Sequence, residues 1–190
     1  MKPKLNVLLT ILVACIACPA FSACSSAPPY WTEETGLKIA EFGDWAVASI
    51  VEQNQCWLFS SPIESIIDTN NAPEEFCRGT SRLVINFSPG SNIYGEFSYD
   101  SGYYFDASKE VYLETSSLSM ELPTREGGIA WASSKKDDHA LISEFELNEY
   151  VMVHGTASNS ITIDDVFSLS GFSDALNRAK VECGLFDLVS

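Results

Sequence analysis

The stretch that decides the fold is Thr162–Cys183, TIDDVFSLSGFSDALNRAKVEC. Its first half alternates, which places Ile163, Asp165 and Phe167 on one face of a β-strand. Gly171 ends the alternation, and apolar side chains then recur at the spacing of a short amphipathic helix. The stretch therefore predicts a strand, a tight turn and a helix that carries a cysteine at its end.

The length and charge of the chain limit what it can be. It has 190 residues, of which 46% are hydrophobic, and this fits one domain with a substantial core. The formal net charge is −15, from 11 Lys and Arg against 26 Asp and Glu. Without the two lysines of the expected leader, nine basic residues face 26 acidic ones and the charge is −17. This balance argues against nucleic acid as a partner and against electrostatic docking on anionic lipid.

Residues 1–23 are typical of an export signal. They begin with two lysines and continue with VLLTILVACIA, an apolar run too short to span a bilayer with ease. Phe21–Cys24 resembles a bacterial lipobox with Cys24 as the lipid attachment site, and Leu12–Cys15 fits the pattern with a shorter apolar core. Cleavage by an ordinary signal peptidase near Ala20–Ala23 and an uncleaved anchor are the alternatives. We expect an exported protein of the periplasm, outer membrane or cell surface, anchored through lipid if Cys24 is modified.

Export permits a disulfide. If Cys24 carries a lipid, three cysteines remain outside the leader, and if it is free, four remain with three possible connectivities. We favour a bridge between Cys56 and Cys183, which closes a loop of well over a hundred residues. Cys77 would then be an unpaired thiol, either buried or reactive.

The rest of the chain predicts one β-domain. Residues 24–41 are rich in Ser and Pro and indicate a flexible tether, and residues 42–190 form the domain. About ten strands are expected, including those near 46–51, 56–60, 81–88, 93–99, 111–114, 118–122, 129–132, 150–156 and 162–169. Strands spaced in this way predict an antiparallel sandwich or barrel, and we favour an all-β antiparallel sandwich with one short C-terminal helix.

Three segments have no clear strand pattern. Residues 62–79 contain Asn, Pro and acidic side chains, which favour a loop with at most one helical turn. Lys135–Asp138 indicates a charged turn, and Leu141–Leu147 fits either a strand or a helix.

Several short motifs, in this order along the chain, resemble the invasion-associated locus B family of exported bacterial proteins. They are Asp44–Val47, Cys56–Pro62, Arg78-Gly79, Pro89-Gly90, Gly102–Phe105, Ala130–Ala132 with Asp137-Asp138, and Asp165–Phe172 with Ala175-Leu176 and Cys183. The resemblance covers roughly residues 42–183. It implies a β-rich domain of the periplasm or surface, linked in some members with host-cell invasion, and it brings no catalytic residues to this chain. The chain departs from the family pattern at Ala157–Ile161, where a Ser-x-Arg-Gly-Thr segment is usual, and at Tyr104, where a proline is usual.

Asp165 is the most unusual polar residue of the predicted core. Its alternation with Ile163 and Phe167 points it to the apolar face, and an unpaired buried carboxylate is costly. We expect its partner to be either Arg78 or backbone N–H groups of a turn, with a structural role favoured over a ligand site.

The histidines give little support for catalysis or metal binding. The chain has only His139 and His154, without a His-x-His pair or a G-x-S-x-G elbow. Ser158, His154 and Asp164 are close in sequence, which leaves a hydrolase as a weak alternative. We expect no enzyme activity, no metal and no cofactor.

Aromatic residues gather within 19 residues of the chain: Tyr94, Tyr99, Tyr103, Tyr104, Phe105 and Tyr112. They fit either the core and its edges or an exposed tyrosine-rich face that binds protein or glycan, for which the five tyrosines are candidates. The favoured function is therefore interaction with a protein or a host surface. The alternative is a periplasmic domain that binds a small ligand or lipid.

Overall fold

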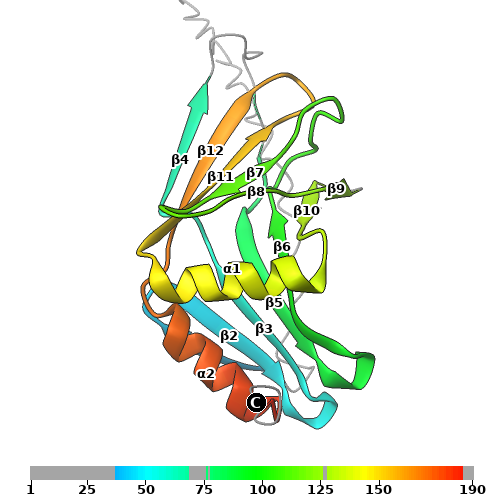
Figure 1. Ribbon diagram of the computed structural model, residues 1–190, viewed down its shortest axis with the longest axis vertical. Coiled ribbons are helices and arrows are strands. Elements are labelled where there is room, and N and C mark those ends of the chain that lie inside the picture. The colour runs from blue at the N-terminus through cyan, green and yellow to red at the C-terminus, as the bar shows by residue number, and fades with distance from the viewer. Residues whose placement is uncertain (1–36, 69–75, 77, 126–127, 186–190) are drawn as a thin grey trace, which may run out of the picture.

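The computed structural model describes residues 37–68, 76, 78–125 and 128–185. These residues form twelve strands in two antiparallel sheets, together with two α-helices (Figure 1). The predicted antiparallel β-sandwich with a short C-terminal helix is confirmed, and a second helix is added. The expected signal peptide (residues 1–23), the lipid attachment site Cys24 and the unpaired Cys77 lie outside the described residues.

The larger sheet has seven strands in the order β1-β2-β3-β5-β6-β10-β9. Their bounds are β1 Lys38–Phe42, β2 Trp45–Ile50, β3 Gln55–Ser60, β5 Arg82–Ser88, β6 Ile93–Asp100, β9 Thr124–Arg125 and β10 Ile129–Trp131. Short 3-10 turns at Val51–Gln53 and Pro89–Ser91 connect β2 to β3 and β5 to β6. Both turns end in an asparagine with positive φ, Asn54 and Asn92, a conformation that asparagine tolerates better than most residues.

The smaller sheet has five strands in the order β4-β12-β11-β7-β8. Their bounds are β4 Glu64–Asp68, β7 Tyr112–Glu114, β8 Ser119–Glu121, β11 Tyr150–Thr156 and β12 Thr162–Ser168. The chain leaves the larger sheet after β3 to make β4 and then returns for β5. In Figure 1 the two sheets lie at opposite ends of the long axis and overlap at the centre.

A single main core joins both sheets to both helices. Helix α1 (Lys135–Leu147) packs on β6, and helix α2 (Phe172–Glu182) packs on β2 and β3. Figure 1 shows both helices beside the larger sheet, below the smaller one. The largest fully buried side chains come from all of these elements: Trp45, Leu58, Ile85, Phe97, Leu113, Phe145, Phe167 and Phe172. Helices and the smaller sheet therefore bury the apolar face of the larger sheet together.

Trp45 holds the junction between β12 and α2 against the larger sheet. Its indole N–H donates to the carbonyl of Ser168 at 3.0 Å, and its ring meets Phe172 edge-on with centroids 4.9 Å apart. Between those two residues, Gly171 has φ +86°, and a Cβ there would collide with the carbonyl oxygen of Phe42. The β1–β2 turn and the β12–α2 turn thus pack so closely that only glycine fits.

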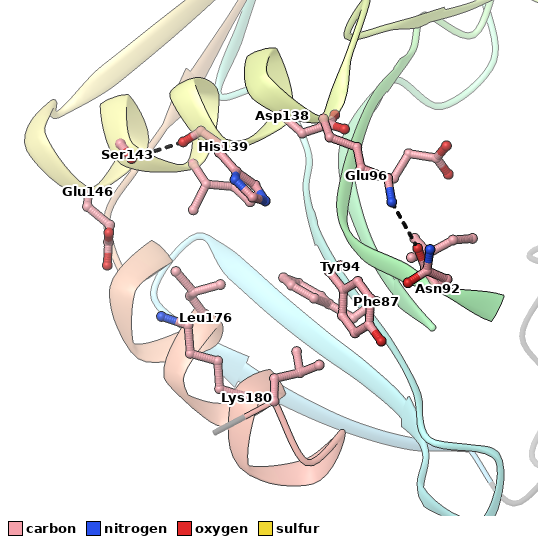
Figure 2. Close-up of a pocket in the computed structure, with 14 residues that line it drawn as sticks. Phe87, Asn92, Tyr94, Glu96, Asp138, His139, Ser143, Glu146, Leu176 and Lys180 are labelled. Carbon is pink, nitrogen blue, oxygen red and sulfur yellow. Dashed lines mark hydrogen bonds between the residues drawn. The ribbon is translucent and has the colours of Figure 1, made fainter. Parts of the chain in front are cut away.

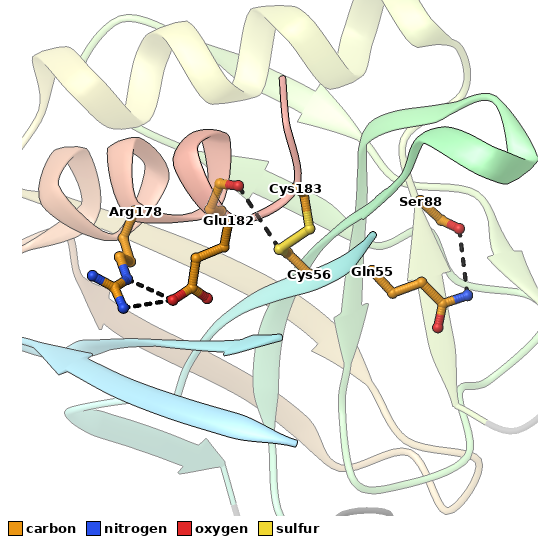
Figure 3. Close-up of a disulfide and its surroundings, with 7 residues drawn as sticks. Gln55, Cys56, Ser88, Arg178, Glu182 and Cys183 are labelled. Carbon is orange, nitrogen blue, oxygen red and sulfur yellow. Dashed lines mark hydrogen bonds and ion pairs between the residues drawn. A yellow bond between two sulfur atoms is a disulfide. The ribbon is translucent and has the colours of Figure 1, made fainter. Parts of the chain in front are cut away.

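The end of α2 is fixed by a disulfide between Cys56 and Cys183, the pair favoured by the sequence (Figure 3). Cys56 lies on β3 with no exposed surface, and Cys183 is 2% exposed. Their Cα atoms are 6.2 Å apart and 127 residues separate them in sequence. The bridge ties the last described helix to a strand near the start of the domain.

Three predicted segments differ from the structure. Lys135–Asp138 is the first turn of α1 and not a free charged turn, because Ser134 caps the helix by accepting the N–H of Asp137 at 3.3 Å. Residues 64–68, expected in a loop, form the edge strand β4. Strand β1 begins at Lys38, inside the range 24–41 that was predicted as a tether.

Reduction of the disulfide should destabilise the domain strongly. A closed loop of 127 residues corresponds to about 5 kcal/mol in the chain-entropy model. Urea denaturation of the oxidised protein, with and without reducing agent, measures the loss. A double variant Cys56→Ser/Cys183→Ser should unfold as easily as the reduced protein and should not respond to reductant. Equal midpoints for oxidised and reduced wild type would contradict the expectation.

Candidate functional site

The buried carboxylate of Asp165 is the centre of the most polar cluster inside the sandwich. Asp165 lies in the middle of β12, opposite Ser65 on β4 and Val153 on β11. It has no exposed surface, and it shares the inward face with Ile163 and Phe167 as the alternation predicted. The inward orientation of this carboxylate is therefore a feature of the strand and not of a loop.

Four side chains donate hydrogen bonds to this carboxylate. Oδ1 accepts from Ser65 Oγ at 2.6 Å and from Arg78 Nη1 at 2.8 Å. Oδ2 accepts from Tyr99 Oη at 2.6 Å, from Ser81 Oγ at 2.8 Å and from Arg78 Nη2. The two arms of the guanidinium thus bind the two carboxylate oxygens, which is the strongest arrangement for this pair.

The donors come from both sheets. Ser65 belongs to β4 of the smaller sheet and Tyr99 to β6 of the larger sheet, while Arg78 and Ser81 lie in the segment that leads into β5. Arg78 is also held by Nε, which donates to the carbonyl of Ser101 at 2.9 Å. The cluster therefore joins the two sheets through one carboxylate.

Burial and hydrogen bonding act in opposite directions on the titration of this cluster. Burial alone would raise the pKa of Asp165, but the hydrogen bonds from Arg78, Ser65, Tyr99 and Ser81 outweigh it and hold the pKa below its ordinary value. Burial raises the pKa of Tyr99 well above its ordinary value and that of Tyr103 to about 12. At neutral pH the carboxylate is ionised and both tyrosines keep their protons.

In this arrangement the carboxylate of Asp165 is fully hydrogen-bonded and out of reach of a substrate. Each carboxylate oxygen already accepts at least two hydrogen bonds, and the side chain has no exposed surface. A general base or nucleophile must be able to reach its substrate. The cluster is a structural site, and of the two partners expected for Asp165, Arg78 is the one present.

The five candidate tyrosines do not gather on one surface. Tyr99 has no exposed surface and Tyr103 is 7% exposed, because both take part in the cores around Asp165 and Arg78. Tyr104 is 72% exposed, whereas Tyr94 and Tyr112 are half-buried on different sheets. The hypothesis of a single exposed tyrosine-rich face is wrong, since Tyr99 and Tyr103 are buried and the other three lie on two sheets and a turn.

His154 lies between two carboxylates on the outer face of the smaller sheet. Its Nδ1 is 2.8 Å from Asp164 Oδ1, and its Nε2 is 3.3 Å from Glu114 Oε2. Ser158 lies beyond the end of β11, so Glu114 and not this serine contacts the second ring nitrogen. No group of three or more His, Cys, Asp or Glu side chains in the described residues is placed to hold a metal ion.

The outer face of the smaller sheet is acidic, a feature that was not predicted. Register places five carboxylates on this face: Glu64, Asp68, Glu114, Glu121 and Asp164. The five strands contain no Lys or Arg. We call this surface the acidic face. Its signal in the sequence was a set of acidic residues at the outward positions of strands whose pairing was unknown.

A cavity of about 490 Å³ lies outside the sandwich, between α1, α2 and the β5–β6 turn (Figure 2). Apolar side chains from all three elements line it, together with several charged groups. Of the candidate site residues that the structure describes, only Tyr94 lines it, because its walls come together only when both helices pack on the larger sheet.

The comparison with solved structures finds the same fold. The crystal structure of invasion associated protein B from Bartonella henselae matches 76% of this chain and 96% of its own chain, with a TM-score of 0.52 and 16% sequence identity. The likeness is one of fold. No protein-family model and no curated protein sequence matches the chain. None of the helices that the structure describes has the length and apolar character needed to cross a bilayer.

Breaking either half of the Asp165–Arg78 pair should destabilise the domain severely. Removal of one partner leaves a buried uncompensated charge, so Asp165→Ala and Arg78→Ala should each cost about 3–5 kcal/mol in unfolding free energy. The double variant should lose much less than the sum of the two. Arg178→Ala, which breaks an i,i+4 helix pair with Glu182 in which the arginine side chain is 48% exposed, is the control and should cost about 1 kcal/mol or less. Additive losses in chemical denaturation would show that the pair is not coupled.

The low pKa of Asp165 should also make stability depend on pH. Because the folded-state pKa lies below the unfolded one, the carboxylate stabilises the fold above the ordinary aspartate pKa of about 3.9. That contribution is lost as the pH falls from there toward the folded-state value. Asp165→Asn should therefore differ most from wild type near neutral pH, and the difference should shrink below about pH 4. A constant difference from pH 7 to pH 2.5, measured by urea denaturation, would contradict the expected ionisation.

Proposed function

We propose that the chain is an exported, non-catalytic binding domain that acts at the bacterial envelope or a host surface by contacting another protein. Its acidic face is the contact surface, and its partner presents basic residues. The fold likeness to a protein that is named for its association with invasion supports the setting. The proposal keeps the function favoured by the sequence and replaces the tyrosine-rich face with the acidic one.

The observation that carries the proposal is the clustering of negative charge on the outer face of the smaller sheet. Glu64, Glu114 and Glu121 are exposed, and the five strands have no positive side chain to offset them. Clustered charges of one sign raise the rate at which an oppositely charged partner associates, and they exclude partners of the same sign. The net charge of −15 adds to this field at longer range.

The acidic face also offers apolar contact area. Ile66 on β4 is 50% exposed and Tyr150 on β11 is 53% exposed. The half-buried Met152 lies on β11 as well, and the half-buried Tyr112 lies on the neighbouring strand β7. Binding surfaces combine apolar and aromatic side chains with a polar rim. A basic segment with apolar residues between its charges would match this composition.

Edge strand β4 gives the partner a place to align. Within the described residues, β4 pairs with β12 alone, so its other edge is not part of a ladder. An extended segment can add to such an edge through main-chain hydrogen bonds. Glu64 is exposed at the start of β4, where a basic side chain of an added segment would meet it.

The chemistry of the described residues supports a role without catalysis. Asp165 is saturated with donors, and His154 meets carboxylates through both ring nitrogens. Nucleophilic catalysis needs a nucleophile within hydrogen-bond reach of its base. Neither cluster has this arrangement.

Neutralising the acidic face should weaken capture of the partner. The variant Glu64→Gln/Glu114→Gln/Glu121→Gln removes three charges from the face, and Glu41→Gln/Glu52→Gln/Asp174→Asn removes three exposed charges elsewhere. Immobilised wild type and both variants are used to retain proteins from envelope fractions at two salt concentrations. We expect that wild type and the control variant retain the same envelope protein at low salt. The face variant should not retain it, and high salt should release it from wild type.

That protein is then purified, and its association rate with the face variant should be on the order of ten-fold lower than with wild type. The proposal fails if the face variant retains the same proteins as wild type at the same rates. It also fails if the control variant loses them equally, because net charge and not the acidic face would then be responsible.

Small-ligand binding is the second candidate function. Apolar side chains from the two sheets fill the core between them, so the sandwich does not provide the site. The observation that favours a ligand is the separate cavity beside the two helices.

A further inference from the structure

We propose that the cavity between α1, α2 and the β5–β6 turn binds a single-chain amphiphile with one carboxylate head, the chemistry of a free fatty acid. The proposal deepens the second candidate function and is independent of the acidic face, which lies on the other sheet. We call this cavity the helix pocket.

The helix pocket is apolar in its walls and of limited size. Phe87, Ile93, Ile142, Leu176 and Leu185 line it, and they come from β5, β6, α1, α2 and the residues after α2. Its volume of about 490 Å³ falls in the range of pockets that enclose ligands of drug size. One short acyl chain fits this space, whereas a diacyl lipid would not.

Lys180 supplies the positive charge at the pocket. Its side chain is half-buried on α2 and runs beside Leu176 in the pocket wall (Figure 2). The ion pairs in the described part of the chain do not include Lys180, whereas its neighbour Arg178 is paired with Glu182. Lys135, the other lysine of the lining, reaches the carbonyl of Asn92 at 3.4 Å. An ammonium group beside an apolar cavity is thus available to an anionic ligand.

His139 adds a hydrogen-bonding group to the pocket from the helix that faces Lys180. Figure 2 shows its ring directed into the cavity from α1, facing α2. Among the described side chains its imidazole has no hydrogen-bond partner, and only its backbone carbonyl is engaged, by Ser143. A ring N–H can donate to a carboxylate that already faces Lys180. Lys180 charges one wall of the pocket, and His139 offers a donor on the facing wall.

The acidic groups of the lining favour one negative charge over two. Asp138 accepts the backbone N–H of Phe97 at 2.8 Å, so its carboxylate is turned to β6. Glu96 and Glu146 also line the pocket, and Figure 2 shows the carboxylate of Glu96 directed away from its centre. Figure 2 shows the carboxylate of Glu146 directed from α1 toward α2, on the side where the Lys180 side chain ends. A dianionic phosphate would be repelled more strongly than a carboxylate there.

The pocket walls are held in place before any ligand arrives. The disulfide fixes the end of α2 to β3, and the N–H of Leu185 donates to the carbonyl of Lys180 at 2.9 Å. α1 is held to β6 by the bond between Asp138 and Phe97. A preformed site loses less free energy to ordering when it binds.

Calorimetric titration of the oxidised chain with decanoate tests the proposal, with decylammonium as the cationic counterpart of equal chain length. Decanoate should bind saturably, below its micellar concentration, and more tightly than decylammonium. Lys180→Gln should weaken decanoate about ten-fold, the value of one charge-assisted hydrogen bond. Lys136→Gln, a lysine of α1 outside the lining, is the matched control and should leave the affinity unchanged.

A second pair of variants locates the binding. Ser143→Trp places a large ring in the pocket from an exposed position of α1 and should abolish binding. Ser173→Trp, at an exposed position of α2 outside the lining, should not. Because both positions are exposed, circular dichroism should show the same folded content in each.

The proposal is overturned if decanoate does not bind saturably, if decylammonium binds as well, or if Ser143→Trp binds like wild type. Binding that appears only after the chain is shortened to end at Leu185 would likewise contradict it for the natural chain. None of these results would affect the retention of proteins by the acidic face, so the two proposals fail separately.

Discussion

The two sheets are held together by one buried carboxylate, which needs hydrogen-bond donors because an unpaired buried charge is costly. Asp165 has no exposed surface, and an ionised carboxylate in that place requires donors from every side. Arg78, Tyr99, Ser81 and Ser65 supply them from both sheets and from the segment between. Any other relative position of the sheets would separate the charge from some of these donors. The cluster therefore selects one packing among those that an apolar interface alone would allow.

The opposite end of the domain is fixed by covalent and steric means. The disulfide joins α2 to β3, and the close approach of Gly171 to Phe42 sets the angle at which α2 leaves β12. Two surfaces of the described residues differ from the rest in chemistry: the acidic face of the smaller sheet and the helix pocket beside the larger one. They differ in chemistry, one being charged and broad and the other apolar and enclosed, and they suit different partners.

The sequence predicted the interior better than the surface. Alternation along β12 placed Asp165 inward, and the cost of an unpaired buried carboxylate left Arg78 or backbone N–H groups of a turn as its partner, of which the structure has Arg78. The exposed strand β4 was missed because all five of its residues are solvent-exposed and give no alternation of burial. Helix α1 was missed at its start because Lys135–Asp138 has the composition of a turn, and the cap at Ser134 decides otherwise. The acidic face and the helix pocket depend on strand register and on helix packing, which no local pattern contains.

The titration of the Asp165 side chain in the folded protein shows whether an ionised carboxylate holds the two sheets together. Carboxyl carbon chemical shifts of the folded protein can be followed by NMR as the pH is lowered, with the Asp165 signal assigned by its absence in Asp165→Asn. We expect this carboxyl to stay ionised below the ordinary aspartate pKa of about 3.9 for as long as the protein remains folded. A pKa at or above that value would mean that burial outweighs the donors, and the charge would then not hold the two sheets together.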